Sequence, residues 1–242
     1  MVGRQRMAKF HRATPIVRRE ALVEATLRSL EEFGHDGTSI RRISAAAGVS
    51  IGLINHHFRS KAELIAAAYE TLAVSLQESM RAQSGNEADL PRTRLSGFFR
   101  ASFAPDILEP GIFSVWLVFW SMVMHSPEMR AVHDRTYRQY RAILEGLLQA
   151  LAASGEAPPF KLRLAAIALS ALLDGLWVEL SLSPTTFKAA EAITVCEDWV
   201  SALCGGALPG LLLLRDAPAR RRGRAGRGRP AHDRPTPQPG KA

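Results

Sequence analysis

The chain of 242 residues has little cysteine and few long apolar runs. Its two cysteines, Cys196 and Cys204, are eight residues apart in a helical pattern. Two such residues are about 12 Å apart, too far for a disulfide. We expect both to be core thiols in a reducing cytoplasm, with redox sensing as the alternative. The most apolar stretch, Ile112 to Met124, has 13 residues and is too short to span a bilayer.

Short motifs of metal and nucleotide sites are also absent. No CxxC, HExxH or P-loop pattern occurs, so we expect no metal, no cofactor and no enzymatic activity. The first 15 residues carry charge but no apolar run of the kind that a signal peptide requires. Together these absences predict a cytoplasmic protein with no membrane partner.

Charge is unevenly distributed along the chain, whose formal net charge is +8. Residues 1–62 hold 11 basic and 5 acidic side chains, residues 63–214 hold 11 and 16, and residues 215–242 hold 9 and 2. A basic N-terminal segment followed by an acidic segment is typical of a DNA-binding domain joined to a domain with another partner. A solvated charge imbalance is the alternative, but it does not explain why the excess coincides with the pattern described next.

The segment from Thr38 to Leu64 is typical of two short helices joined by a tight turn. Ser39 can cap the first helix, and Gly48 can adopt the positive φ that the corner needs. Ser50 can cap the second helix, which leaves a surface suited to docking, formed by Ile51, Gly52, Leu53, Asn55 and His56. The segment therefore predicts a helix-turn-helix that binds double-stranded DNA.

Helical patterns cover most of the remaining chain, and no convincing alternating strand occurs, so we predict an all-α fold. The first helix runs from Pro15 to Phe33 and ends at Gly34 and Gly37. A capping box, Ser60 to Glu63, starts a helix that reaches about Gln83. Prolines separate the later helices, which we expect at roughly 92–103, 111–125, 128–153, 161–182 and 186–207.

The pattern GVSxGxxxxHFxxKxxL is present as Gly48, Val49, Ser50, Gly52, His57, Phe58, Lys61 and Leu64. With the preceding helices it resembles the TetR family of bacterial regulators over residues 15–65. The resemblance implies an all-α homodimer with an N-terminal three-helix DNA-reading domain and a C-terminal domain that binds a small ligand and dimerises through its last two long helices. Family members usually carry Tyr in place of Asn55, which can still donate to phosphate or bind an adenine edge.

Three distant segments narrow this resemblance to one branch of the family. IGLINHHF, WLVFWSMVMHSP and ALLDGLW, within residues 9–205, are similar to the choline-responsive repressors of glycine-betaine synthesis genes. This narrower resemblance implies a protein that represses osmoprotectant genes, with the repression relieved by choline. A repressor of another operon that senses a different cationic or hydrophobic molecule is the alternative.

The resemblance and the patterns together divide the chain into four parts. Residues 1–14 form a flexible basic arm, and residues 15–65 the DNA-binding domain with the helix-turn-helix at about 39–58. Residues 66–207 form the ligand-binding and dimerisation domain. Residues 215–242 are rich in Arg, Gly and Pro and are expected to be disordered.

Candidate DNA contacts lie on the recognition helix and at the helix starts on either side of it. The N-terminal half of that helix supplies the base contacts, and Lys61 resembles the phosphate-contacting lysine of the family. His57 either contacts DNA or packs beside Phe58. The full set is Thr38, Ser39, Arg42, Ser50, Ile51, Gly52, Leu53, Asn55, His56, His57 and Lys61, and Arg4, Arg6, Lys9 and Arg12 of the arm can add phosphate or minor-groove contacts.

Aromatic residues gather in the second domain, where a packed core is the alternative to a site. Asp174 lies in an otherwise apolar helix three residues before Trp177, and Tyr137 and Tyr140 lie on the helix before it. A quaternary ammonium neither donates nor accepts hydrogen bonds, so its receptor must use aromatic faces, to which one carboxylate can be added. We therefore predict a site for a cation, choline by resemblance, formed by Phe113, Trp116, Phe119, Trp120, Tyr137, Asp174 and Trp177.

The seven arginines between Arg220 and Arg234 favour a competing hypothesis, a nucleoid or RNA-binding protein. Such a segment alone would bind polyanions without sequence preference and with strong salt dependence.

Deleting residues 215–242 should leave sequence-specific DNA binding intact in a mobility-shift assay with matched and scrambled duplexes. Loss of all binding would contradict the repressor hypothesis.

Overall fold

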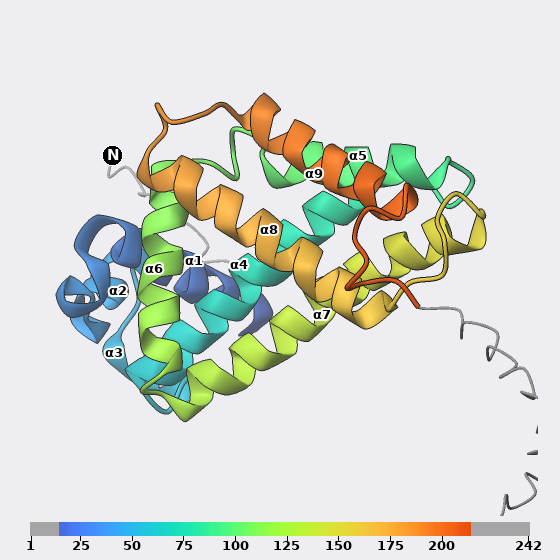
Figure 1. The fold of residues 1–242 in the computed structure, drawn as a ribbon. Helices are drawn as coiled ribbons and strands as arrows, with labels where there is room; N and C mark the ends of the chain where they lie inside the picture. The colour runs from blue at the N-terminus through green and yellow to red at the C-terminus, as the bar shows by residue number, and fades with distance from the viewer. Residues whose placement is uncertain (1–14, 214–242) are drawn as a thin grey trace, which may run out of the picture. The chain divides into compact units, whose positions relative to one another are not determined.

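The structure is a computed structural model that describes residues 15–213. Over these residues its regular elements are helices, so the all-α prediction is confirmed (Figure 1). The predicted basic arm and the Arg-rich segment lie outside the described residues. The helices are α1 (Pro15–Gly37), α2 (Ile40–Ala47), α3 (Ile51–His57), α4 (Lys61–Gln83), α5 (Pro91–Ser102), α6 (Pro110–Val123), α7 (Pro127–Ala153), α8 (Leu162–Leu182) and α9 (Ala189–Cys204).

Proline and glycine set many of the helix boundaries. Pro91, Pro110 and Pro127 occupy the first positions of α5, α6 and α7, where the missing amide proton has no intrahelical partner to lose. Gly34 interrupts α1 with φ 62° and ψ −169°, so the regular part of this helix ends where the sequence predicts. Gly48 adopts a left-handed conformation, φ 63°, after α2.

The start of α4 differs in one detail from the predicted capping box. The Oγ of Ser60 accepts from the amide of Glu63 at 3.1 Å, as expected. The Glu63 carboxylate instead accepts from the amide of Arg59 at 2.7 Å. The carboxylate reaches one residue beyond the cap, because the extended backbone at Ser60 turns the Arg59 amide toward the helix.

The N-terminal helices enclose a small apolar core of their own. Leu22 of α1, Ile43 of α2, Ile54 of α3 and Leu64 of α4 are fully buried within it. Phe58, which follows α3, is also buried and lies under the guanidinium of Arg19. This shared core fixes α3 against α1 and α4, so the recognition helix is held by packing rather than by its own short length.

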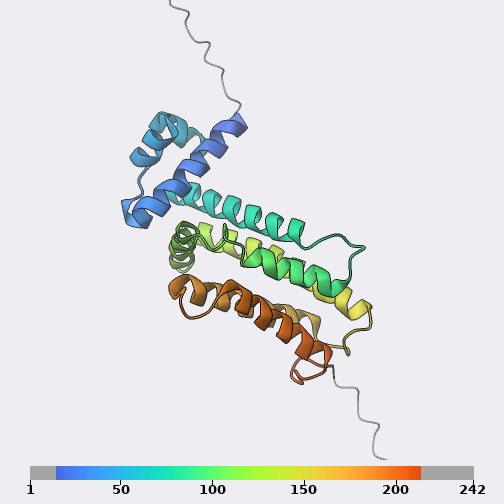
Figure 2. The same ribbon diagram turned by 90° about the horizontal axis from the view of Figure 1, so that it is seen from above.

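The remaining helices form layers that Figure 2 shows from above. α4 packs on α5 and α7, which in turn pack on α8 and α9. α6 crosses these layers and contacts α1, α7 and α8. After α9 the chain folds back, and the amide of Lys161 donates to the carbonyl oxygen of Leu211 at 2.7 Å.

By length and composition α8 is long and apolar enough to cross a membrane, and within residues 15–213 it is the one helix that passes this test. Core helices of soluble proteins pass the same test. In the fold, α8 packs on α7 and α9 and carries the buried side chains of Leu169 and Leu173. Its apolar character therefore has a structural role in this core.

Candidate DNA-binding surface and ligand cavity

The recognition helix α3 presents most of its predicted contact residues to solvent. Ile54 is fully buried and anchors the helix, whereas 42% of the Ile51 side chain is exposed. Gly52, Asn55 and His56 are exposed, and Leu53 and His57 are half-buried. The ring of His57 lies 6.5 Å from that of Phe58, centroid to centroid, so packing and DNA contact are both compatible with its position.

The two cap serines have the geometry that the sequence predicts. The Oγ of Ser39 accepts from the amide of Arg42, and that of Ser50 from the amide of Leu53, both at 3.3 Å. Residues Gly48–Gly52 also match the GxSxG pattern of a nucleophile elbow, which requires a turn from a strand to a helix. Here the turn joins two helices, and Ser50 serves as the cap of α3.

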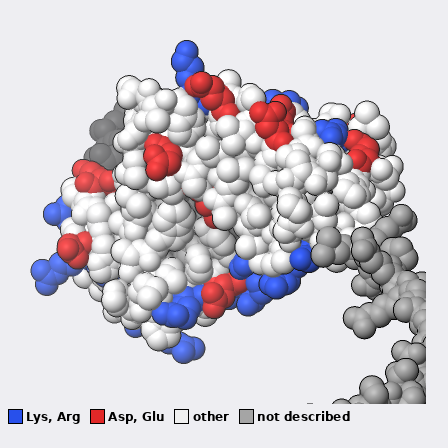
Figure 3. All heavy atoms as spheres, viewed as in Figure 1, with Lys and Arg blue, Asp and Glu red and all other residues white. Residues whose placement is uncertain are grey.

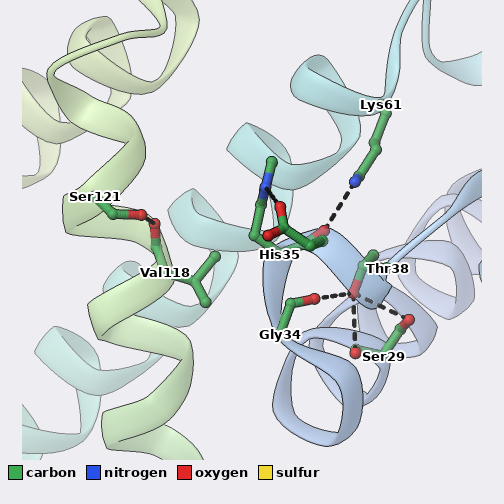
Figure 4. Close-up of polar contacts among 8 residues, drawn as sticks. Ser29, Gly34, His35, Thr38, Lys61, Val118 and Ser121 are labelled. Atoms are coloured by element: carbon green, nitrogen blue, oxygen red, sulfur yellow. Dashed lines mark hydrogen bonds and ion pairs between the residues drawn. The ribbon is translucent and has the colours of Figure 1, made fainter.

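Thr38 does not lie on the surface, so its prediction as a DNA contact is wrong. Its side chain is 1% exposed. Its hydroxyl lies 2.7 Å from the carbonyl oxygen of Gly34 and 2.9 Å from that of Ser29, and the hydroxyl of Ser29 donates to it at 3.2 Å (Figure 4). These hydrogen bonds of Thr38 hold the start of α2 against the end of α1.

Two cations of this region already have partners within the protein. The ammonium of Lys61 donates to the carbonyl oxygen of His35 at 2.9 Å, across 26 residues of sequence (Figure 4). The guanidinium of Arg42 lies over the ring of Phe33 at 4.1 Å from its centroid, and both side chains are exposed. Phosphate contact by Lys61 and Arg42 stays a prediction.

A cavity of about 90 Å³ lies between α4, α6, α7 and α8. The tryptophans Trp116, Trp120 and Trp177 contribute to its wall together with Tyr137 and Asp174, as the sequence predicts. The other lining residues are Ala73, Leu76, Gln77, Met80, Ser102, Ile107, Thr136, Tyr140 and Leu173. Five of the seven predicted ligand residues therefore meet at one cavity.

The three tryptophans stand close to one another around this cavity. Ring centroids are 6.1 Å apart for Trp116 and Trp120, 6.1 Å for Trp120 and Trp177, and 6.5 Å for Trp116 and Trp177. Trp177 crosses both other rings at 83°, so the faces of the set point in different directions. The indole nitrogen of Trp177 donates to the carbonyl oxygen of Ile107 at 3.3 Å, which joins α8 to the loop before α6.

Phe113 and Phe119 are not part of the cavity wall, so their prediction as ligand residues is wrong. Phe119 is fully buried and stacks on Tyr69 at 4.7 Å between ring centroids. Phe113 is 7% exposed and packs edge-on against Trp177 at 5.2 Å. Both rings support the tryptophans from behind. Spacing along α6 could not separate them from the lining, because the aromatic residues occupy much of the helix circumference.

Sequence reasoning missed several lining residues on α4 and α7. Gln77 and Met80 belong to the helix that begins at Lys61, and only a tertiary contact between α4 and α7 brings them to the cavity. On α7, Thr136 directly precedes Tyr137, so spacing from Tyr137 gave no signal for it, whereas Tyr140 is three residues after Tyr137 and was named beside it without being assigned to the site.

Asp174 is the one carboxylate in the cavity wall. Burial raises its pKa to about 6, against the opposing effects of the hydrogen bond from Tyr137 and of the positive charge of Arg141. The Tyr137 hydroxyl donates to its Oδ2 at 3.2 Å. Burial also raises the pKa of Tyr137, so that hydroxyl keeps its proton. Near neutral pH the cavity therefore holds a buried negative charge with few partners, which favours a cationic ligand.

The remaining candidate chemistry does not form a second site. Cys196 is buried, and burial raises its pKa to about 12, consistent with a core thiol. Among residues 15–213 there is no cluster of three His, Cys, Asp or Glu side chains that could hold a metal ion.

Comparison with known families identifies both halves of the chain. The family model described as "Bacterial regulatory proteins, tetR family" matches residues 22–68, and that of "BetI-type transcriptional repressor, C-terminal" matches residues 91–205. The HTH-type transcriptional regulator BetI of Burkholderia thailandensis is 32% identical over 188 residues, which are 77% of this chain and 93% of that protein. The chain belongs to the TetR family of transcriptional regulators and has a BetI-type C-terminal domain.

Other relatives agree with this assignment. The regulator BetI of Pseudomonas fluorescens is 33% identical over 186 residues, covering 76% of this chain and 91% of that protein. A putative transcriptional regulator from Pseudomonas aeruginosa PAO1 superposes with a TM-score of 0.77 at 42% identity, over 86% of this chain and 100% of that one. A putative regulator from Saccharomonospora viridis, solved in complex with choline, has a TM-score of 0.65 at 22% identity, over 77% and 96% of the two chains, and shares the fold.

The raised pKa of Asp174 means that the ionised carboxylate lowers the free energy of unfolding, and replacing Asp174 by Asn should remove this effect. Its folded pKa of about 6 lies above the ordinary value of 3.8, so the fold loses stability as pH rises through this interval. Two pKa units correspond to about 3 kcal/mol. Asp174→Asn should therefore raise the free energy of unfolding of this TetR-family regulator at pH 8, with roughly half of that gain at pH 5. Urea unfolding at both pH values measures this, and an equal effect at the two would contradict it.

Proposed function

We propose that this chain is a homodimeric repressor that binds a palindromic operator and leaves it when the cavity takes up choline. The observation that carries the proposal is the group of three tryptophans around the buried carboxylate of Asp174. Such a cavity is unfavourable for a neutral or anionic ligand, because the carboxylate would stay unpaired. It suits a quaternary ammonium, since each face-on aromatic contact contributes about 0.5–2 kcal/mol.

The relatives support choline over other cations. The BetI name of the curated relatives and the choline complex of the Saccharomonospora viridis regulator both fit the chemistry of this cavity. On this basis the controlled genes are those that convert choline to glycine betaine, an osmoprotectant. A repressor of another operon with a different cationic or hydrophobic effector is the remaining candidate.

DNA recognition in this proposal is the task of α3 and its flanking helix starts. We assign contacts with thymine methyl groups to Ile51 and Leu53, and hydrogen bonds to His56 and Asn55. Ser39, Arg42, Ser50, Gly52, His57 and Lys61 complete the set of proposed contacts. Two α3 helices must lie about 34–36 Å apart to read the two halves of a palindrome. Because this partner is chromosomal DNA, we expect a cytoplasmic protein.

Two helices connect the cavity with the DNA-binding helices. α4 begins at Lys61, whose ammonium binds the end of α1, and reaches the cavity through Gln77. α6 contributes Trp116 to the cavity wall and also packs on α1. At the start of α6 the contact is close, because a Cβ on Gly111 would collide with the Glu31 carboxylate of α1. A ligand that binds better to another arrangement of α4 and α6 changes the spacing of the recognition helices. Coupling of about 1–3 kcal/mol would lower operator affinity roughly 5- to 150-fold.

A choline titration of the protein–DNA complex tests this function directly. The duplex is one selected from a random pool by the full-length protein, so no operator has to be assumed. Choline should release the protein from this duplex, and Trp116→Ala should weaken choline binding by about 0.5–2 kcal/mol for the lost cation–π contact. Calorimetry and thermal melting on the same variant separate affinity from stability. Trp116→Ala that melts at a lower temperature but binds choline unchanged would contradict the cage.

The homodimer is proposed from the outward face of α8. Leu164 and Leu182 are 38% and 61% exposed on this helix, and Val195 of α9 is 44% exposed. Figure 3 shows that the middle of the face over α6 and α8 is almost free of charged side chains. A face of this kind is typical of a twofold four-helix contact between two chains.

Analytical ultracentrifugation should give a dimer at micromolar protein concentration. Val195→Glu should shift the distribution toward the monomer, because it places a charge on the proposed contact. Ser201→Glu, an exposed substitution in the same helix beside the groove to α5, serves as the matched control and should leave the mass unchanged. An unsubstituted protein that sediments as a monomer contradicts this part of the proposal.

A further inference from the structure

Most hydroxyl groups in the cavity wall already donate within the protein. Ser102 donates to the carbonyl oxygen of Phe98 at 2.9 Å, and Thr136 donates to that of Val132 at 3.0 Å. Tyr137 donates to Asp174. Since each hydroxyl has one proton, none of these three can donate to a ligand without breaking a bond that the fold already makes.

Tyr140 differs from these three residues. Its ring lies 6.1 Å from that of Phe98 and 6.2 Å from that of Tyr137, centroid to centroid, and it lines the cavity. No residue of the described chain, 15–213, hydrogen-bonds its hydroxyl. Burial and then the charge of Asp174 raise the pKa of Tyr140, so the phenol stays protonated at physiological pH. The Tyr140 hydroxyl is therefore a hydrogen-bond donor in the cavity wall that has no acceptor within residues 15–213.

Gln77 supplies a matching acceptor. Its Nε2 donates to the carbonyl oxygen of Thr136 at 3.1 Å, and this bond orients the side-chain amide. Over residues 15–213 its Oε1 makes no hydrogen bond of its own. Thr136 and Tyr140 are one turn apart on the same face of α7, and both line the cavity together with Gln77.

We propose that Tyr140 and Gln77 bind a hydroxyl group of the ligand, so that the cavity selects a quaternary ammonium that carries a hydroxyl over one that carries none. The assignment rests on the proposed function, because it concerns the same cavity. The tryptophans and Asp174 hold the cationic end, while Tyr140 donates to the hydroxyl oxygen and Gln77 accepts its proton. A ligand without the hydroxyl leaves both groups without a ligand partner, and sites that hydrogen-bond a ligand hydroxyl discriminate against analogues that lack it.

The test compares choline with tetramethylammonium, which has the same cationic head and no hydroxyl. Calorimetry on the full-length protein should show choline binding about tenfold tighter. Tyr140→Phe keeps the ring beside Phe98 and should reduce this ratio to about twofold or less, mainly through weaker choline binding. Gln77→Met keeps the side-chain volume and should lower the ratio as well. Tetramethylammonium affinity should change less than about twofold in either variant.

Tyr69→Phe is the matched control, because the Tyr69 phenol pairs with Nδ1 of His133 at 2.9 Å and does not line the cavity. It should leave the ratio unchanged. If the unsubstituted protein binds both cations equally, the hydroxyl assignment fails while the proposed function stands. If it binds neither, the proposed function fails and the assignment with it. Tyr140→Phe that leaves the ratio unchanged, or weakens both ligands by one factor, also overturns the assignment.

Discussion

The site depends on one unfavourable interaction, the burial of the Asp174 carboxylate among aromatic rings. A lone charge in such surroundings is destabilising, and the hydrogen bond from Tyr137 offsets only part of that cost. Arg141 acts from outside the cavity wall and does not neutralise the charge. A cation bound there, as we propose, would offset part of that cost. A fold selected for stability alone would place an apolar or amide side chain at this position.

The same packing that encloses this charge also connects it with the DNA-binding helices. α4 and α6 each reach from the cavity to α1, and each makes a specific contact there. The Lys61 ammonium binds the carbonyl oxygen of His35, and Gly111 allows the Glu31 carboxylate to approach the start of α6. Tyr69 of α4 stacks on Phe119 of α6, so the two helices also share a core near α1. These contacts are the route by which the proposed ligand would act on the DNA-binding helices, because closely packed elements transmit strain.

Local sequence signals predicted the elements of this fold well, because their causes are local. Gly34 and Gly48 end helices through their own backbone conformation, and Ser39 and Ser50 cap the helices that follow them. The predicted helix boundaries in the second domain lie within three residues of those observed, since prolines occupy the first positions of several helices. α9 begins at Ala189 rather than at 186, because the Glu191 carboxylate accepts from the amide of Lys188 and caps the helix there.

The sequence by itself determined the helical class, the helix-turn-helix and the aromatic character of the candidate site, since periodicity, caps and composition need no distant contacts. Tertiary structure alone decided which aromatic rings face the cavity. Phe119 and Trp116 lie three residues apart on one helix, yet one is core and the other lines the site, because Tyr69 of α4 covers the first. It likewise decided that Thr38 is buried rather than exposed, because two carbonyl groups of α1 surround its hydroxyl. Burial depends on what packs opposite, and that partner comes from another part of the chain.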